Sequence, residues 1–319
     1  MLPETQGLKF FPLLRRLALH LAAFLLVCAA VYGLWREFHA VDPSEVARAA
    51  GAWGWNSVVG ALLLSALSFL LMGFVEWMGL RWTGARVAML PTLGVSFVAS
   101  AMAHSLGANL LVSGAIRARL YRRHGVTLRQ VAATTLFQGF TFAVGLATLT
   151  ALSLLVSGGR EMSEATRIPA RVGDGLGIAL LAATLAYIGL CTWLRRPLSA
   201  FGHSVRLPSG RVALAQTLIG AIDNAVAACI FWILLPPASG GFFTFVAAYA
   251  PSVVLGLISH VPAGVGVFES SLATLLRGAP PAALAAAFLG YRMFFFALPL
   301  AIAGLALAYD SLRRRGPAN

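Results

Sequence analysis

Unbroken apolar runs of about 20 residues constrain this chain more than any other feature of its sequence. A run of that length can cross the roughly 30 Å hydrocarbon core of a bilayer as an α-helix. Because that core offers no water to backbone groups, only helices and closed barrels span it, and the continuous apolar pattern favours helices. The six full transmembrane helices that we expect are Leu17–Trp35, Asn56–Leu80, Val131–Ser157, Gly175–Leu194, Ala213–Leu235 and Ala282–Ala308.

The scarcity of charge indicates a membrane protein rather than a soluble one. Hydrophobic residues make up 59% of the 319 residues and charged residues only 11%, whereas a soluble domain carries roughly 25% charged residues. A soluble fold of this size has too much surface to hide so many apolar side chains. The net charge of +13 comes from short arginine clusters between the apolar runs. No basic patch has interleaved aromatic residues, so we expect no nucleic-acid partner.

Two further apolar regions are interrupted near their middles. Val87–Leu120 contains the segment His104–Asn109 and then Gly114, and Phe242–Leu276 contains the segment Ser259–Gly266. Glycine and proline interrupt helices, and each region is long enough for two half-helices. We therefore predict two re-entrant helical hairpins, each of which enters and leaves the bilayer on the same side.

The distribution of basic residues supports this topology. With a cytoplasmic N-terminus and two re-entrant hairpins, 17 of the 24 Lys and Arg residues fall in cytoplasmic segments and 6 in outer segments. Such a bias is what the positive-inside rule describes. A single crossing at the first hairpin would move the cluster from Arg117 to Arg129 outside and remove most of the bias. We expect a multi-pass protein of a bacterial inner membrane with both termini in the cytoplasm.

The order of elements predicts an inverted repeat within a single membrane domain, residues 1–319. Each half, approximately 1–158 and 159–319, reads span, span, hairpin, span, and the second half starts from the opposite side of the membrane. The expected fold is an all-α membrane protein with six full transmembrane helices and two re-entrant hairpins. Inverted repeats whose broken helices meet near the midplane are typical of secondary transporters.

Ionisable residues inside the spans are candidates for function, because a charge in the bilayer needs a partner. Arg292 is a plausible partner for Asp223 and the leading candidate partner for Glu269. Such a pair could fix helix packing, or the planar guanidinium could bind a phosphate head group. Glu76, near the end of its span, is expected either to face lipid or to pair with Arg81 at the membrane interface.

His104 and His260 lie at the two hairpin tips. Together with Glu269 they suggest a metal site, but their spacing fits no ligand motif, and we expect neither a metal nor a cofactor. The N-termini of broken helices present free N–H groups, which suit an anionic head group without a metal. No catalytic triad order, phosphate-binding loop or dinucleotide fingerprint is present, so we assign no catalytic residue.

The second interrupted region carries a motif that resembles the signature of a known family. Val261–Glu269, followed by Leu272, resembles the "P-x-G-x-G-x-x-E" signature of the transmembrane domain of bacterial lysylphosphatidylglycerol synthase/flippase proteins. Tyr291-Arg292 is similar to the tyrosine-arginine of that domain's last helix. The first-hairpin motif of the family, in which an arginine follows a glycine by three residues, is similar to Asn109, Gly114 and Arg117. The resemblance covers essentially the whole chain.

The resemblance implies a function in lipid movement. In that family this domain moves aminoacylated phosphatidylglycerol across the inner membrane, and a separate soluble domain makes the lipid. The chain resembles the stand-alone members, several of which are linked to other lipids such as hopanoids. Ala263, in place of the more usual glycine, and Gln138, where related chains often carry a charge, leave the head group open. The residues expected to bind an anionic or amphoteric lipid are Glu269, Arg292, Arg117, Asp223, His104, His260, Asn109 and Tyr291.

Two other functions are compatible with the same residues. The first is a membrane-embedded enzyme that acts on a lipid head group and uses His104, His260 and Glu269 as acid and base groups. The second is a non-catalytic accessory protein of hopanoid or aminoacyl-lipid biosynthesis. Translocation requires polar residues around one cavity, and catalysis requires a histidine within hydrogen-bond reach of a carboxylate. An accessory protein would show the polar residues paired with one another. The sequence is also compatible with a homodimer.

Overall fold

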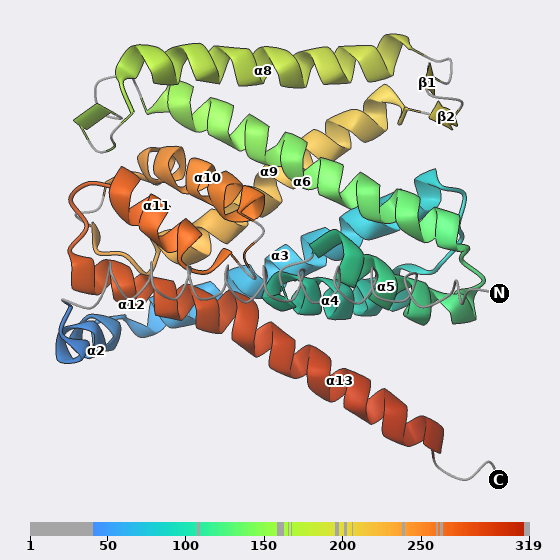
Figure 1. The fold of residues 1–319 in the computed structure, drawn as a ribbon, viewed down its shortest axis with the longest axis horizontal. Helices are drawn as coiled ribbons and strands as arrows, with labels where there is room; N and C mark the ends of the chain where they lie inside the picture. The colour runs from blue at the N-terminus through green and yellow to red at the C-terminus, as the bar shows by residue number, and fades with distance from the viewer. Residues whose placement is uncertain are drawn as a thin grey trace, which may run out of the picture.

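The structure, a computed structural model, describes residues 41–106, 109–157, 163–164, 166, 168–194, 198–200, 203–205, 207–237, 240–259, 261 and 264–315. Side chains are left aside at 105–112, 198–205 and 310–315. The first predicted span, Leu17–Trp35, lies outside the described residues. Within the described part the chain is helical apart from one short β-hairpin (Figure 1).

Five helices in the described part are long and apolar enough to cross a membrane, and they coincide with the other five predicted spans. The last of them is continuous through a π-helical turn, η4, between two α-helical parts. The spans are α3 (Trp55–Trp82), α6 (Leu128–Val156), α8 (Ala170–Trp193), α9 (Gly210–Trp232) and the succession α12 (Pro281–Tyr291), η4 (Arg292–Ala297) and α13 (Leu298–Arg315).

Large apolar side chains cover the outside of these helices. Trp55 is 79% exposed, Leu136 64% and Leu305 73%. Water would make such a surface a strong aggregation site, because monomeric soluble proteins rarely expose wide apolar patches. A hydrocarbon solvent removes that penalty, so the exposed surface agrees with the membrane character that the composition predicts.

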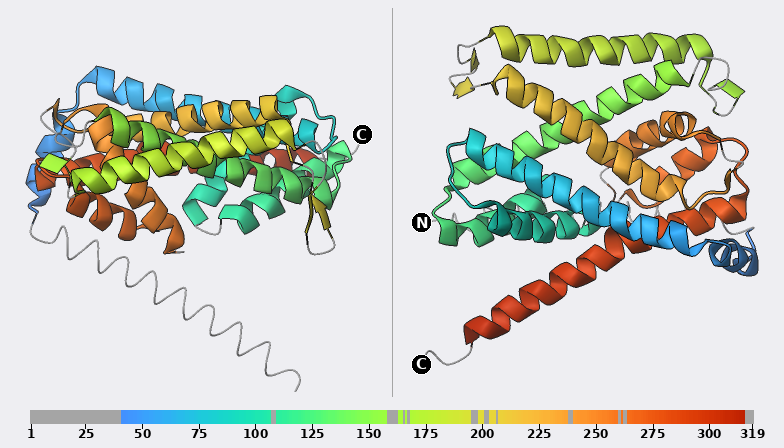
Figure 2. Two further views of the ribbon diagram at one scale, coloured as in Figure 1. Left: turned by 90° about the horizontal axis from the view of Figure 1, so that it is seen from above. Right: turned by 180° about the vertical axis from the view of Figure 1, so that it is seen from behind.

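Each of the two interrupted apolar regions folds as a pair of helices around a break, as the sequence predicts. The first pair is α4 (Met89–Leu106) and α5 (Asn109–Tyr121), and the second is α10 (Phe242–Ile258) and α11 (Val267–Leu275). The two members of each pair pack together. At about 1.5 Å per residue, α11 is too short to cross a bilayer. The pairs lie on opposite sides of the centre of the molecule (Figures 1 and 2).

The glycines of the second break are required by its backbone. Gly264 has φ +63° and Gly266 has φ +84°, values that a side chain makes unfavourable. Gly264 also passes so close to the backbone of Gly256 in α10 that a Cβ atom would lie 3.3 Å from the Gly256 Cα. The two glycines of the signature motif therefore let α11 begin directly against α10.

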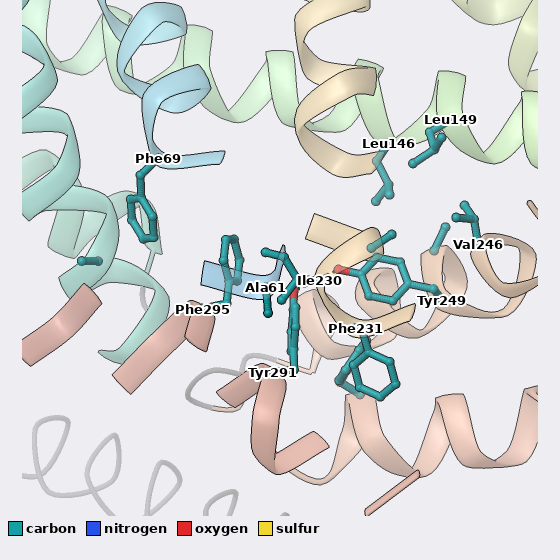
Figure 3. Packing of buried hydrophobic residues seen from close by; sticks show 14 of the residues in the cluster. Ala61, Phe69, Leu146, Leu149, Ile230, Phe231, Val246, Tyr249, Tyr291 and Phe295 are labelled. Atoms are coloured by element: carbon teal, nitrogen blue, oxygen red, sulfur yellow. Dashed lines mark hydrogen bonds between the residues drawn. The ribbon is translucent and has the colours of Figure 1, made fainter. Parts of the chain in front are cut away.

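Close glycine contacts and a shared aromatic cluster hold the long helices together. A methyl group added at Gly145 of α6 would collide with the backbone of Gly220 in α9, and small residues of this kind let membrane helices approach closely. In the core, Phe231, Tyr249 and Tyr291 bring together α9, α10 and α12 (Figure 3). The packing unites elements that lie far apart in the sequence.

The packing of the two helix pairs is reciprocal. α10 packs on α6, and α4 packs on α13. α3 contacts both α4 and α6, while α9 contacts both α10 and α12. The remaining elements are α2 (Pro43–Gly51), which packs on α12, the 3-10 helix η1 (Arg122–His124), and the strands β1 (Leu198–Ala200) and β2 (His203–Val205) between α8 and α9.

Candidate functional site

The predicted pair of Glu269 and Arg292 is present in the structure. The Arg292 Nε donates to Glu269 Oε1 at 2.9 Å, and the Arg292 Nη2 lies 2.5 Å from the same oxygen. Only 3% of the Glu269 side chain is exposed, against 21% for Arg292. The pair joins the short helix α11 to the last span, as the sequence predicts, and one of its members is accessible.

Local backbone structure positions both members of this pair. Glu269 is the third residue of α11, and its Oε2 accepts the N–H of Gly266, the residue that precedes the helix, at 2.8 Å. Arg292 opens the π-helical turn η4, a rare structure that is frequent at functional sites. Its guanidinium lies over the ring of Phe296, 4.8 Å from the centroid. The Glu269 carboxylate therefore accepts a hydrogen bond at the N-terminus of α11 and also pairs with Arg292.

Tyr291, predicted to bind substrate, supports Arg292 from the aromatic core. Its hydroxyl lies 3.0 Å from the hydroxyl of Tyr249 in α10, and the two hydroxyl groups point toward each other in Figure 3. The Tyr291 ring also stacks on Phe295, with the ring centroids 5.4 Å apart. Because both rings are buried, Tyr291 ties the last span to α10 next to the ion pair.

Asp223 lies on α9 and is held by α3. Its Oδ1 accepts a hydrogen bond from Ser68 Oγ at 2.5 Å. Of the two acidic partners considered for Arg292, the structure therefore places Glu269 in the ion pair, and Asp223 has a hydroxyl partner instead. Sequence spacing could not decide between them, because both carboxylates belong to elements that pack beside α12.

A second buried ion pair corrects the prediction for Glu76. Glu76 is 0% exposed, and its Oε2 lies 2.8 Å from the Nη2 of Arg117, while its Oε1 accepts from the Tyr121 hydroxyl at 2.7 Å. The predicted partner Arg81 lies instead over the ring of Trp77, 4.8 Å from the centroid. Residues five apart on a helix do not face each other, which is why Arg81 does not reach Glu76.

Arg117 is surrounded by polar partners from three other helices. Besides Glu76 of α3, its Nη2 donates to Gln138 of α6 and, at 3.5 Å, to Ser100 of α4. The Nε2 of Gln138 in turn donates to the carbonyl of Met72 at 3.2 Å. Arg117 is 2% exposed. The guanidinium is thus enclosed. The cluster of Glu76, Arg117, Tyr121 and Gln138 lies at the C-terminal end of α5.

Sequence reasoning did not place Tyr121 or Gln138 in a site, and it counted Glu76 as a candidate for function without its partner Arg117. Glu76 is an ionisable residue within an apolar run, and such a residue needs a partner at membrane depth. Tyr121 follows Arg117 by four residues on a helix and so shares its face. The structure also separates two predicted site residues, because Arg117 and Arg292 belong to different ion pairs.

His104 lies in the last turn of α4 among aromatic rings. Its ring centroid is 5.6 Å from that of Phe295, 6.0 Å from Phe69 and 6.1 Å from Phe296. Its Nδ1 is buried and has no hydrogen-bond partner within the described part of the chain. Phe296 thus contacts both His104 and the Arg292 guanidinium. His260 and the side chain of Asn109 lie outside the described residues.

Helices long enough to span a membrane, with two helix pairs around breaks, define a polytopic membrane protein. Each helix pair contributes one residue to a Glu–Arg pair within the helical core. The chain belongs to the family described as "Lysylphosphatidylglycerol synthase TM region", whose model matches residues 17–303. The resemblance found in the signature motif is thereby confirmed.

Two relatives are similar over most of the chain. The inner membrane protein YbhN of Escherichia coli (strain K12) is 28% identical over 298 residues, which cover 90% of this chain and 91% of that protein. The uncharacterized protein slr0712 of Synechocystis sp. (strain ATCC 27184 / PCC 6803 / Kazusa) is 28% identical over 278 residues, 82% of this chain and 86% of that protein. The chain is a multi-pass inner membrane protein of this family.

Proposed function

We propose that the protein translocates a membrane lipid with an anionic or amphoteric head group between the leaflets of a bacterial inner membrane. The observation that carries this proposal is the Glu269–Arg292 pair. It joins a helix break to a π-helical turn, and the Arg292 side chain keeps 21% of its surface exposed. Family membership supports a connection with lipids.

An exchange of anionic partners at Arg292 would let a lipid phosphate bind without leaving the Arg292 charge unpaired. In the resting state Glu269 neutralises Arg292. A lipid phosphate offers the planar guanidinium a second anion of matching geometry. When the phosphate displaces the carboxylate, Glu269 keeps its hydrogen bond from the Gly266 N–H. No covalent bond changes, so the proposal describes a transporter and not an enzyme.

The same proposal includes the inverted repeat with two re-entrant hairpins. The reciprocal packing of α10 on α6 and of α4 on α13 supports it, because a two-fold relation between the halves would produce both contacts. Broken helices that meet near the midplane let one half move against the other around a fixed site. In this topology both termini are cytoplasmic, as the arginine distribution favours.

A second candidate function, an accessory role in lipid biosynthesis, has one observation in its favour. The cluster around Arg117 is enclosed, and its charged groups are paired with one another. A head-group enzyme has less support, because the Nδ1 of His104 has no carboxylate partner in the described part of the chain. The translocation assay below separates the transporter from the accessory protein.

The test is a reconstitution of the purified protein into vesicles that carry a fluorescent phospholipid in one leaflet. We expect wild type to move the lipid and Arg292→Ala to abolish the movement, while Arg292→Lys restores little because an ammonium lacks the planar fork. Arg277→Ala is the matched control, since Arg277 is an exposed arginine in the loop before α12. Normal movement by a well-folded Arg292→Ala protein contradicts the mechanism, and no movement by wild type favours the accessory function.

A further inference from the structure

A shallow pocket lies between the C-terminal end of α3 and the N-terminal end of α9. Its volume is about 460 Å³, and it is separate from both ion pairs. The residues that line it combine a cation, two indoles, two apolar side chains and the first turn of a helix. They are Trp77, Met78, Arg81, Trp82, Ser209 and Val212.

The polar groups of this pocket are hydrogen-bond donors. The Arg81 guanidinium lies over the Trp77 ring, 4.8 Å from the centroid, and is exposed. Ser209 precedes α9 but makes no side-chain cap, so the first N–H groups of α9 keep their positive end for another acceptor. No acidic residue lines the pocket.

A phosphate group matches this set of donors. Helix N-termini and arginine forks both bind phosphate oxygens, and the pocket offers the two together. The ligand chemistry indicated by the pocket is therefore an anion with several oxygens.

The surroundings of the pocket identify a lipid as the source of that phosphate. Tryptophan residues at the end of a membrane-length helix are typical of the head-group level of a bilayer. A row of exposed apolar residues runs along another face of α9, and its members are Leu214 at 46% exposure, Leu218 at 53% and Ile222 at 51%. Residues four apart share a helix face. This outer face of α9 is apolar, as a helix surrounded by acyl chains requires.

We propose that this pocket binds the phosphate of an anionic membrane phospholipid and that the bound lipid stabilises the contact between α3 and α9. Arg81 and the N-terminus of α9 hold the phosphate, and Met78 and Val212 contact the glycerol region. The two helices belong to different halves of the chain, so the lipid links the halves at their membrane interface. The site does not depend on translocation at Arg292.

The experiment measures binding of phosphatidylglycerol to the purified full chain by native mass spectrometry and by the thermal stabilisation that added lipid produces in detergent. We expect stabilisation of wild type by phosphatidylglycerol. Arg81→Gln should weaken binding about tenfold or more, because a hydrogen bond to a charged group contributes about 1.5–3 kcal/mol. Arg129→Gln, which removes another exposed arginine, should bind as wild type does.

A second pair of variants keeps the test independent of folding. Ser209→Asp places a negative charge in the pocket, yet aspartate is a good residue before a helix. Ser209→Asn is an equally good cap without the charge. We expect both variants to be at least as stable as wild type without lipid, and only Ser209→Asp to lose phosphatidylglycerol binding.

Three results would overturn the proposal. They are equal binding by wild type, Arg81→Gln and Ser209→Asp; equal stabilisation by phosphatidylcholine; and equal stabilisation by inorganic phosphate, which would indicate an adventitious anion only. Because none of these measurements involves lipid movement, failure here leaves the translocation proposal intact, and failure of the vesicle assay leaves this site intact.

Discussion

The buried pair of Glu76 and Arg117 gives a sharp prediction about stability. Both side chains are at most 2% exposed and are held by hydrogen bonds from α4, α5 and α6. Removal of one member of a buried pair leaves an uncompensated charge and costs about 3–5 kcal/mol. Glu76→Gln leaves a guanidinium that stays charged, since arginine does not lose its proton in proteins. It should therefore destabilise the protein by that amount.

The partner variant and the double variant should behave differently. Arg117→Met leaves Glu76 with the Tyr121 hydroxyl as its hydrogen-bond donor. We expect Arg117→Met to cost less than Glu76→Gln. The double variant Glu76→Gln/Arg117→Met has no buried charge, and it should recover most of the loss because neutral replacement of a buried pair is often tolerated.

Reversible unfolding in mixed micelles with increasing SDS, followed by circular dichroism, measures these differences. Glu45→Gln is the matched control, because its pair with Arg48 is exposed at 55% and 75% and spans 3.8 Å. An exposed pair contributes at most about 1 kcal/mol, so Glu45→Gln should be close to wild type. Equal stability of Glu76→Gln and Glu45→Gln, or additive losses in the double variant, would refute the reasoning.

Three further predictions concern packing, the helix break and topology. Gly220→Ala should destabilise the protein by about 1–3 kcal/mol in the same assay, because the new methyl group meets the α6 backbone. The control Gly94→Ala, with nothing within 4 Å of the new methyl group, should leave stability unchanged. Equal effects of the two variants would contradict the close contact between α6 and α9. Gly266→Ala and Gly278→Ala both force a side chain into φ +84°. Only Gly266→Ala alters the hydrogen bond between the Gly266 N–H and Glu269, so lipid movement in vesicles should fall in that variant alone. Equal losses in both variants would argue against a role for this hydrogen bond. In a background without native cysteines, a cysteine at position 122 should react with a membrane-impermeant reagent from the cytoplasmic side and one at position 278 from the outer side, and the opposite pattern rules out two re-entrant hairpins.

The sequence by itself determined the membrane class and the five spans of the described part, and it made Arg292 the leading candidate partner of Glu269. Apolar runs of about 20 residues are decisive because a bilayer imposes their length. The signature motif was equally informative, since its glycines adopt positive φ at Gly264 and Gly266 and its glutamate caps the helix that they begin. Local chemistry and local geometry are linked there within a few residues.

Only the tertiary structure decided which polar residues meet across helices. A membrane helix is apolar all round, so its sequence carries no stripe that marks the buried face. For that reason Glu76 could not be assigned to Arg117 rather than Arg81, nor Asp223 to Ser68 rather than Arg292. The π-helical turn at Arg292 was equally hidden. These partners are set by close packing at points such as Gly145 and Gly220, a property of two helices together and not of either one.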